Sequence, residues 1–168
     1  PVIQQSRILC DSLISEFVGQ QKKLPLYGVG ISLGGTILLN ACCQKLLGEK
    51  SNQSLLDGLV CISSPIDLFE CSKTIEKPRN GFYQNWILQR LLRQTLADPF
   101  TSNEKEKLLL EELNHKKNKL IKTIRDFDEY FTAPRWGYKD VETYYELASP
   151  KSKIWNSYEF LPSILFVQ

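Results

Sequence analysis

The 168-residue sequence contains no methionine, only one histidine and no strong excess of charge of either sign. Its formal net charge is +2, which gives no reason to expect nucleic acid or an anionic membrane as a partner. No apolar run is long enough to span a bilayer and no basic-then-apolar leader is visible, so any membrane association is expected to come from regions outside this chain. A proline start and the absence of methionine predict a fragment of a longer protein.

The five cysteines lack the spacing of a metal site. Their number is odd, none forms a Cys-x-x-Cys pair, and none has a histidine nearby. We therefore expect buried, reduced thiols in an intracellular protein, cytoplasmic or membrane-associated, with neither a bound metal nor an organic cofactor. The residues are Cys10, Cys42, Cys43, Cys61 and Cys71.

A glycine-rich stretch, Gly28-Val29-Gly30-Ile31-Ser32-Leu33-Gly34-Gly35, separates a predicted strand from a predicted helix. The apolar run from Leu24 to Ile31 is typical of a strand covered on both faces, which favours a central position in a parallel sheet. The run from Leu33 to Leu47 has helical apolar spacing and ends before Gly48. The stretch is therefore predicted to form a sharp strand-to-helix turn.

Within this turn, Gly30-x-Ser32-x-Gly34 has the spacing of a nucleophile elbow. A serine hydroxyl can attack a carbonyl only if the turn lifts it clear of the backbone. Glycines around the serine, Gly35 included, are expected to let strand and helix approach closely. Ser32 is the candidate nucleophile, and the backbone N–H of Leu33 is the candidate oxyanion-hole donor at a helix N-terminus.

A glycine-rich turn can instead cradle a phosphate group. The dinucleotide fingerprint is absent, however, because Gly28-x-Gly30 is followed three residues later by Leu33. A P-loop is also disfavoured, since no Lys-Ser or Lys-Thr pair follows Gly34-Gly35. The predicted strand before this turn and the predicted helix after it both favour a nucleophile elbow.

The remaining pattern predicts an α/β fold. A helix is expected from Gln4 to Val18, packed on the sheet, and further buried strands are expected at Leu56 to Ile62 and Leu161 to Val167. A strand, a helix and a strand over this length form a βαβ unit with a right-handed crossover. We expect a mostly parallel sheet within a single domain over residues 1–168.

Residues 66–135 carry no strand signal and are predicted to form a helical lid or cap over the strand ends. One helix is expected from Tyr83 to Leu96, and a long one from Ser102 to about Phe131, opened by a capping box at Thr101-x-x-Glu104. The apolar stripe of the first helix is expected to comprise Trp86, Ile87, Leu91 and Leu92.

Two other residues could take part in catalysis, but each has a simpler explanation. His115 lies in a cluster of lysines on a predicted long helix, where an imidazole is more often a solvated surface group than a general base. Asp67 follows the second strand, where a carboxylate more often caps the next turn than serves as a triad acid.

The chain resembles the YheT-like branch of the α/β-hydrolase superfamily, the abhydrolase-domain proteins. The elbow stretch carries this resemblance together with Ser63-Ser64-Pro65-Ile66-Asp67-Leu68 after the next strand. It extends along about the whole chain. The other matching segments are Ile124-Arg125-Asp126-Phe127-Asp128, Thr132-Ala133-Pro134, Gly137-Tyr138, Tyr144-Tyr145 and Ala148-Ser149.

This resemblance implies a partial α/β-hydrolase fold and a serine hydrolase acting on carboxylic esters or lipid-like acyl substrates. Ser32 matches the family's nucleophile and Leu33 its oxyanion-side amide. The family's aspartate follows a strand matching Leu161 to Val167 and its histidine comes later, so both are expected beyond residue 168. We therefore expect these residues alone to be nearly inactive, with apolar sheet edges left uncovered.

Two other functions stay open at this stage. A non-catalytic relative of the hydrolases could bind a protein through its lid surface, and the same nucleophile could transfer an acyl group to an acceptor other than water. Acyl-chain length, the alcohol group and the oligomeric state are not encoded in any motif of the sequence.

Overall fold

The computed structural model describes residues 5–12, 25–43, 56–98, 104–114 and 120–168. They fall into two compact units. The sheet unit comprises Pro1–Ile66 and Ser149–Gln168, and the helical unit comprises Asp67–Ala148. The helical unit thus extends beyond the expected boundary at residue 135. Its proposed role as a lid stays a prediction.

The sheet unit contains three parallel strands in the order β1-β2-β3. They are β1 (Tyr27–Ile31), β2 (Gly58–Ile62) and β3 (Ser163–Val167). All three expected strands are present, each beginning two or three residues later than predicted, and the α/β class is confirmed. The expectation that β1 is central was wrong for the described sheet, because β2 occupies the middle and β1 lies at an edge.

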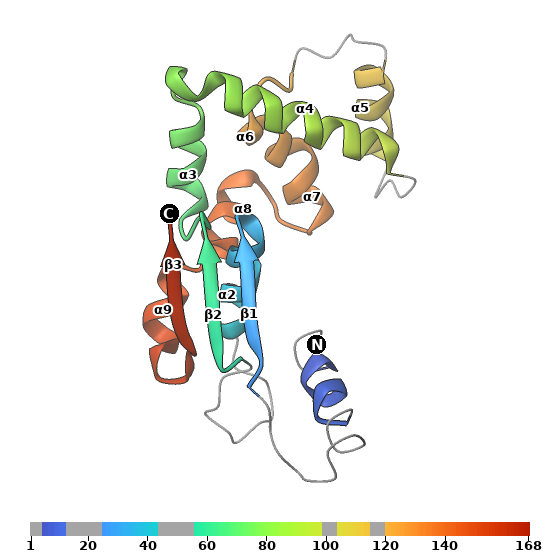
Figure 1. Cartoon of the computed structure of the whole chain (residues 1–168). Helices are drawn as coiled ribbons and strands as arrows, with labels where there is room; N and C mark the ends of the chain where they lie inside the picture. Colours follow the sequence, from blue (N-terminus) through green and yellow to red (C-terminus); the bar gives the residue numbers. More distant parts are fainter. Residues whose placement is uncertain (1–4, 13–24, 44–55, 99–103, 115–119) are drawn as a thin grey trace. The chain divides into compact units, whose positions relative to one another are not determined.

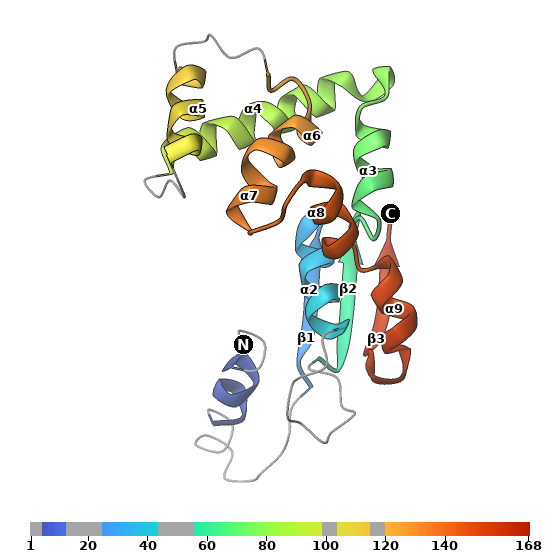
Figure 2. The same cartoon turned by 180° about the vertical axis from the view of Figure 1, so that it is seen from behind.

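One face of this sheet is covered by α2 (Leu33–Cys43) and α9 (Lys151–Ser157), as Figures 1 and 2 show from opposite sides. Leu39 of α2 is fully buried against Leu59 and Cys61 of β2, and Ile154 of α9 packs on the same cluster. The helices are also joined directly by Lys153 Nζ, which donates to Asn40 Oδ1 at 2.6 Å. The predicted continuation of α2 to Leu47 lies outside the described residues.

The opposite face of the sheet is apolar, and the described residues leave much of it exposed. Side chains alternate along β1, so Gly28 and Gly30 face α2 while Tyr27, Val29 and Ile31 point away and are 62–67% exposed. In register with them on β3, Leu165 is 59% exposed. Within the described residues, the prediction that β1 is covered on both faces was therefore wrong, whereas the expected uncovered apolar surface is present.

Residues 5–12 are helical, as expected, and residues 13–18 of that prediction lie outside the described part. The side chains of Ile8 and Leu9 are 63% and 60% exposed, so they do not pack on the sheet as predicted. Cys10 is also exposed, which corrects the expectation of uniformly buried thiols. Cys42, Cys43 and Cys61 are buried, and burial raises the pKa of Cys42 to about 11.

The helical unit holds helices of very different lengths. Among the described residues, none is both long and apolar enough to cross a membrane. Its elements are α3 (Leu68–Ile75), η1 (Pro78–Asn80), α4 (Gly81–Ala97), α5 (Glu104–Asn114), α6 (Ile124–Phe127), the π-helix η2 (Asp128–Thr132), α7 (Ala133–Arg135) and α8 (Val141–Ala148).

The predicted long helix from Ser102 to Phe131 is interrupted. Residues 120–123 are not helical, and a new helix, α6, begins after Thr123. Thr123 Oγ1 accepts from the Asp126 N–H at 3.0 Å, and the Asp126 carboxylate accepts from the Thr123 N–H at 2.9 Å. This capping box stabilises a helix start at this point. The box predicted at Thr101 and Glu104 involves residues outside the described part.

Helix α4 was predicted at nearly its observed bounds, and its predicted apolar stripe was wrong at Trp86. Leu88 and Thr95 are 3% and 5% exposed, and Leu91 and Leu92 are partly buried beside them. Trp86, expected in the apolar stripe, is 57% exposed. The indole therefore lies on the opposite side of the helix from the core of this unit.

An ion cluster joins α4, α5 and α7 within the helical unit. Arg135 donates to Glu106 Oε1 from Nε at 2.8 Å and to Asp98 Oδ2 from Nη1 at 2.9 Å. The Glu106 side chain is only 3% exposed. A buried carboxylate needs a charged partner, because unpaired it loses its hydration without compensation.

We expect Arg135→Met to lower the free energy of unfolding by about 3 kcal/mol, since it leaves Glu106 buried without its guanidinium. The matched control is Lys73→Met, which breaks an exposed pair with Glu70 and should cost less than about 1 kcal/mol. Urea unfolding followed by circular dichroism at 222 nm checks both values. Equal losses in the two variants would contradict the structural importance of the cluster.

Candidate active site

Ser32 lies between the end of β1 and the first residue of α2, and its backbone is left-handed, with φ of 52°. Its N–H donates to the Ile62 carbonyl at 2.8 Å, and its own carbonyl accepts from the Gly35 N–H at 3.1 Å. The side chain is exposed. A left-handed serine costs on the order of 1–3 kcal/mol and persists only where its surroundings enforce it.

Strand and helix meet here without side chains between them. A Cβ added at Gly30 would lie 2.3 Å from the Gly35 Cα, which no packing adjustment of side chains could relieve. A Cβ at Gly35 would lie 2.0 Å from Ser64 Oγ. A Cβ at Gly34 would meet nothing within 4 Å. The steric requirement therefore falls on Gly30 and Gly35, whereas Gly34 borders open space beside the serine.

The segment after β2 anchors the same turn, which the sequence reasoning missed. Ser64 Oγ donates to the Ile62 carbonyl at 3.1 Å and lies 3.5 Å from the Gly30 carbonyl oxygen. Thr36, buried in the first turns of α2, donates from Oγ1 to the Pro65 carbonyl at 2.6 Å. The only sequence signal for this anchor was the segment Ser63-Ser64-Pro65. No pattern of neighbouring residues connects that segment to the elbow.

Leu33 is the first residue of α2, and the N–H groups of a first helical turn have no intrahelical acceptor. They form the positive end of the helix dipole. The Leu33 amide, directly after Ser32, therefore occupies a position suited to binding an oxyanion that forms at the serine. The residue itself is 45% exposed, so a substrate could approach it.

A second left-handed serine lies next to the first. Ser63 follows β2 with φ of 45°, and its N–H donates to the Val167 carbonyl at 2.7 Å. Because Ile31 and Ile62 are register partners, Ser32 and Ser63 occupy equivalent positions after neighbouring parallel strands. Both side chains are exposed. The carboxyl ends of parallel strands are where open α/β sheets bind ligands.

Two other residues were considered as catalytic candidates, and the described structure assigns a catalytic role to neither. Asp67 caps α3, its Oδ1 accepting from the Glu70 N–H at 3.0 Å, as the simpler explanation predicted. His115 lies outside the described residues, and since the sequence has a single histidine, the described part contains none. Nor do the described residues include a cluster of histidine, cysteine or carboxylate side chains that could hold a metal ion.

The chain has a parallel sheet, and a left-handed serine lies at the sharp turn between β1 and α2. These features are those of part of an α/β-hydrolase fold. Comparison with curated proteins agrees. The chain is 32% identical over 139 residues to a monoacylglycerol lipase of Saccharomyces cerevisiae, an alignment covering 80% of this chain and 29% of that protein. No family model and no solved structure matches the chain.

Two further relatives point the same way. The putative esterase YheT of Escherichia coli is 34% identical over 129 residues, covering 74% of this chain and 34% of YheT. The medium-chain fatty acid ethyl ester synthase/esterase 2 of Saccharomyces cerevisiae is 30% identical over 162 residues, covering 84% and 35%. The chain thus spans about a third of the length of these relatives. It belongs to the α/β-hydrolase superfamily.

We expect Gly30→Ala to destabilise the protein by about 3 kcal/mol, because the added methyl group collides with backbone rather than with a movable side chain. Gly34→Ala, two residues after Ser32, is the control and should be neutral or slightly stabilising, since its methyl group meets open space. Thermal and urea unfolding of both variants provide the measurement. A Gly34→Ala loss as large as that of Gly30→Ala would contradict the observed packing.

The strain at Ser32 can be measured by comparing two substitutions at that position. Ser32→Gly should be more stable than Ser32→Ala by about 1 kcal/mol, because glycine adopts positive φ without a Cβ penalty. At the exposed Ser152 in α9 the order should reverse, since alanine is the better helix former. The same order at both positions would exclude strain at Ser32.

Proposed function

We propose that this chain carries the nucleophile of a serine hydrolase that cleaves carboxylic esters, including lipid-like acyl esters, through an acyl-enzyme on Ser32. The observation that carries the proposal is the exposed, left-handed Ser32 at a turn enforced by the contact between Gly30 and Gly35. The names of the relatives, a lipase and esterases, support the same reaction class.

In the proposed reaction, Ser32 Oγ forms a bond to the ester carbonyl carbon while its proton passes to a general base. The carbonyl oxygen becomes an oxyanion, which the N–H of Leu33 stabilises at the N-terminus of α2. When the tetrahedral intermediate collapses, the alcohol leaves with the proton from the base. Water then attacks the acyl-serine by the same route, which releases the acid and restores Ser32.

The base and the acid that orients it are not assigned among the described residues. The described part contains no histidine, and Asp67 is engaged as a helix cap. We propose that both come from other parts of the protein, in agreement with the resemblance to the YheT-like branch. Without them a serine hydrolase loses several powers of ten in rate, so these 168 residues alone should turn over esters very slowly.

Acyl transfer to an alcohol is the second candidate function. One relative is named both as an ethyl ester synthase and as an esterase. The same acyl-serine serves both reactions, because only the acceptor that attacks it differs. Product analysis with ethanol present separates the two acceptors, since transfer yields an ethyl ester where hydrolysis yields the free acid.

We expect a fluorophosphonate probe to label the intact protein at Ser32, because such probes modify only serines that are activated as nucleophiles. Ser32→Ala should abolish labelling. Ser63→Ala is the matched control, since it removes a neighbouring exposed serine of the same left-handed conformation, and it should retain labelling. In-gel fluorescence and mass spectrometry of the labelled peptide provide the readout.

Labelling that disappears in Ser63→Ala instead would reassign the nucleophile. An absence of labelling in a folded intact protein would exclude the hydrolase and favour the non-catalytic alternative, a relative of the hydrolases that binds another protein. The isolated 168-residue chain serves as the second comparison, and it should label far more slowly than the intact protein.

A further inference from the structure

The segment from Lys77 to Ala97, which contains α4, carries cations and no acidic residue at all. All of its cationic side chains are exposed, and no ion pair joins them to an acidic residue within the described part of the chain. Such a run is unusual in a chain whose net charge is only +2. The cations are Lys77, Arg79, Arg90 and Arg93.

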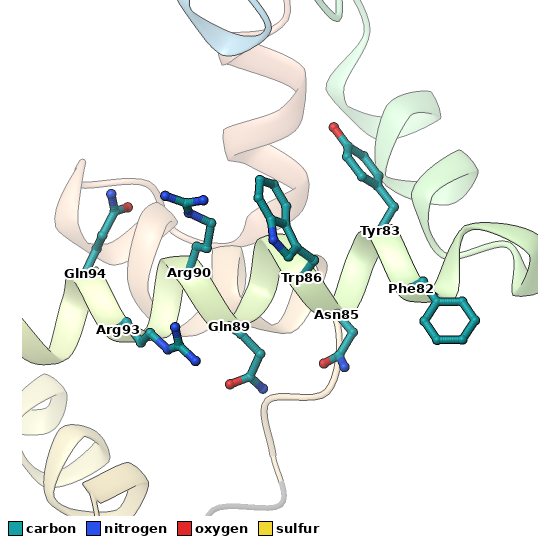
Figure 3. A pocket seen from close by; sticks show the side chains of 8 residues that line it. All are labelled: Phe82, Tyr83, Asn85, Trp86, Gln89, Arg90, Arg93 and Gln94. Carbon is teal, nitrogen blue, oxygen red and sulfur yellow. The ribbon is translucent and has the colours of Figure 1, made fainter.

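Large aromatic side chains share the exposed face of α4 with two of these cations, Arg90 and Arg93. Phe82 is 96% exposed, Trp86 57% and Tyr83 56%. Figure 3 shows the side chains in two rows along the helix, one running from Phe82 to Arg93 and the other from Tyr83 through Trp86 to Arg90. Together they line a shallow, open hollow. The Arg90 guanidinium lies 4.9 Å from the centre of the Trp86 ring.

Poor packing of the helix does not explain this exposed face, because the opposite side of α4 packs on a core of its own. Leu88 is 3% exposed and belongs to a buried cluster with Phe127 and Phe131. The helix is therefore held in its unit by one side. On its other side, the described residues leave three aromatic rings exposed, which is unfavourable in water unless another apolar surface covers them.

We propose that this face of α4 binds the surface of an anionic lipid bilayer. Phenylalanine and tryptophan side chains partition into the interfacial region of a membrane, where aromatic residues are enriched. Arginines on the same helix face meet the headgroup phosphates, and anionic lipid attracts a basic segment further. The exposed aromatic and cationic side chains from Phe82 to Arg93 are spread over about 17 Å of helix, which fits an extended surface better than a small pocket.

The proposal places a membrane contact inside this chain, whereas we expected from the sequence that any such contact would lie outside it. It is independent of the proposed hydrolase activity, because no step in the argument involves Ser32. The experiment can therefore use the intact protein with Ser32→Ala throughout, so that hydrolysis of vesicle lipids does not alter the surface being tested.

Binding is measured by co-sedimentation with phosphatidylcholine vesicles, with and without 30 mol% phosphatidylserine, at low and high salt. We expect partitioning at least about tenfold stronger with phosphatidylserine, and a loss of most of that difference at high salt. Arg93→Glu should lower binding to the anionic vesicles by at least about tenfold, because it reverses a charge at the surface. Trp86→Ala and Phe82→Ser should each weaken it severalfold.

Matched controls change a tryptophan and a cation elsewhere on the surface. Trp155→Ala removes a tryptophan that is 77% exposed in α9, and Lys139→Glu reverses an exposed lysine outside α4. Both should bind vesicles like the parent, and circular dichroism verifies that every variant is folded. Three results would overturn the proposal: equal binding to both vesicle types, binding that none of the three α4 substitutions changes, or no binding at low salt. Either of the last two would favour a protein partner for this face.

Discussion

The contact between β1 and α2, made without intervening side chains, is the constraint on which the candidate site depends. Because Gly30 and Gly35 touch backbone to backbone, the chain must reverse direction within one residue, and that residue is Ser32. The close approach of Gly30 and Gly35 also holds the first turn of α2 beside the carboxyl end of β1. A bulkier residue at Gly30 would separate strand from helix and displace the Leu33 amide along with the serine, and one at Gly35 would collide with Ser64.

The elbow could be predicted from the sequence because its cause is local. Glycine spacing reports where the backbone must pass closely or adopt positive φ, and the flanking apolar runs mark the strand and the helix. The contribution of Ser64 and Pro65 could not be predicted in the same way. They lie about thirty residues further along the chain, and only the parallel pairing of β1 with β2 brings them to Gly30 and Thr36.

The errors in the predicted fold have a shared origin. An apolar run fixes the presence of a strand but not its neighbours, so β1 was expected at the centre of the sheet and lies at its edge. Apolar periodicity likewise does not distinguish a core face from an exposed aromatic one, which is why Trp86 was misassigned. The helix break near Thr123 could have been found, since Thr-x-x-Asp is a readable capping signal.

The two left-handed serines differ in what explains their strain. At Ser63 the strained turn brings the next residues into contact with the elbow, where Ser64 reaches the Gly30 carbonyl and Pro65 accepts from Thr36. Packing therefore accounts for it. The hydroxyl of Ser32, by contrast, makes no hydrogen bond within the described part of the chain, and glycine would fit the same backbone at lower cost. A strained residue whose side chain contributes nothing to packing is better explained by chemistry at that side chain, and this favours a nucleophile at Ser32 over a purely structural turn.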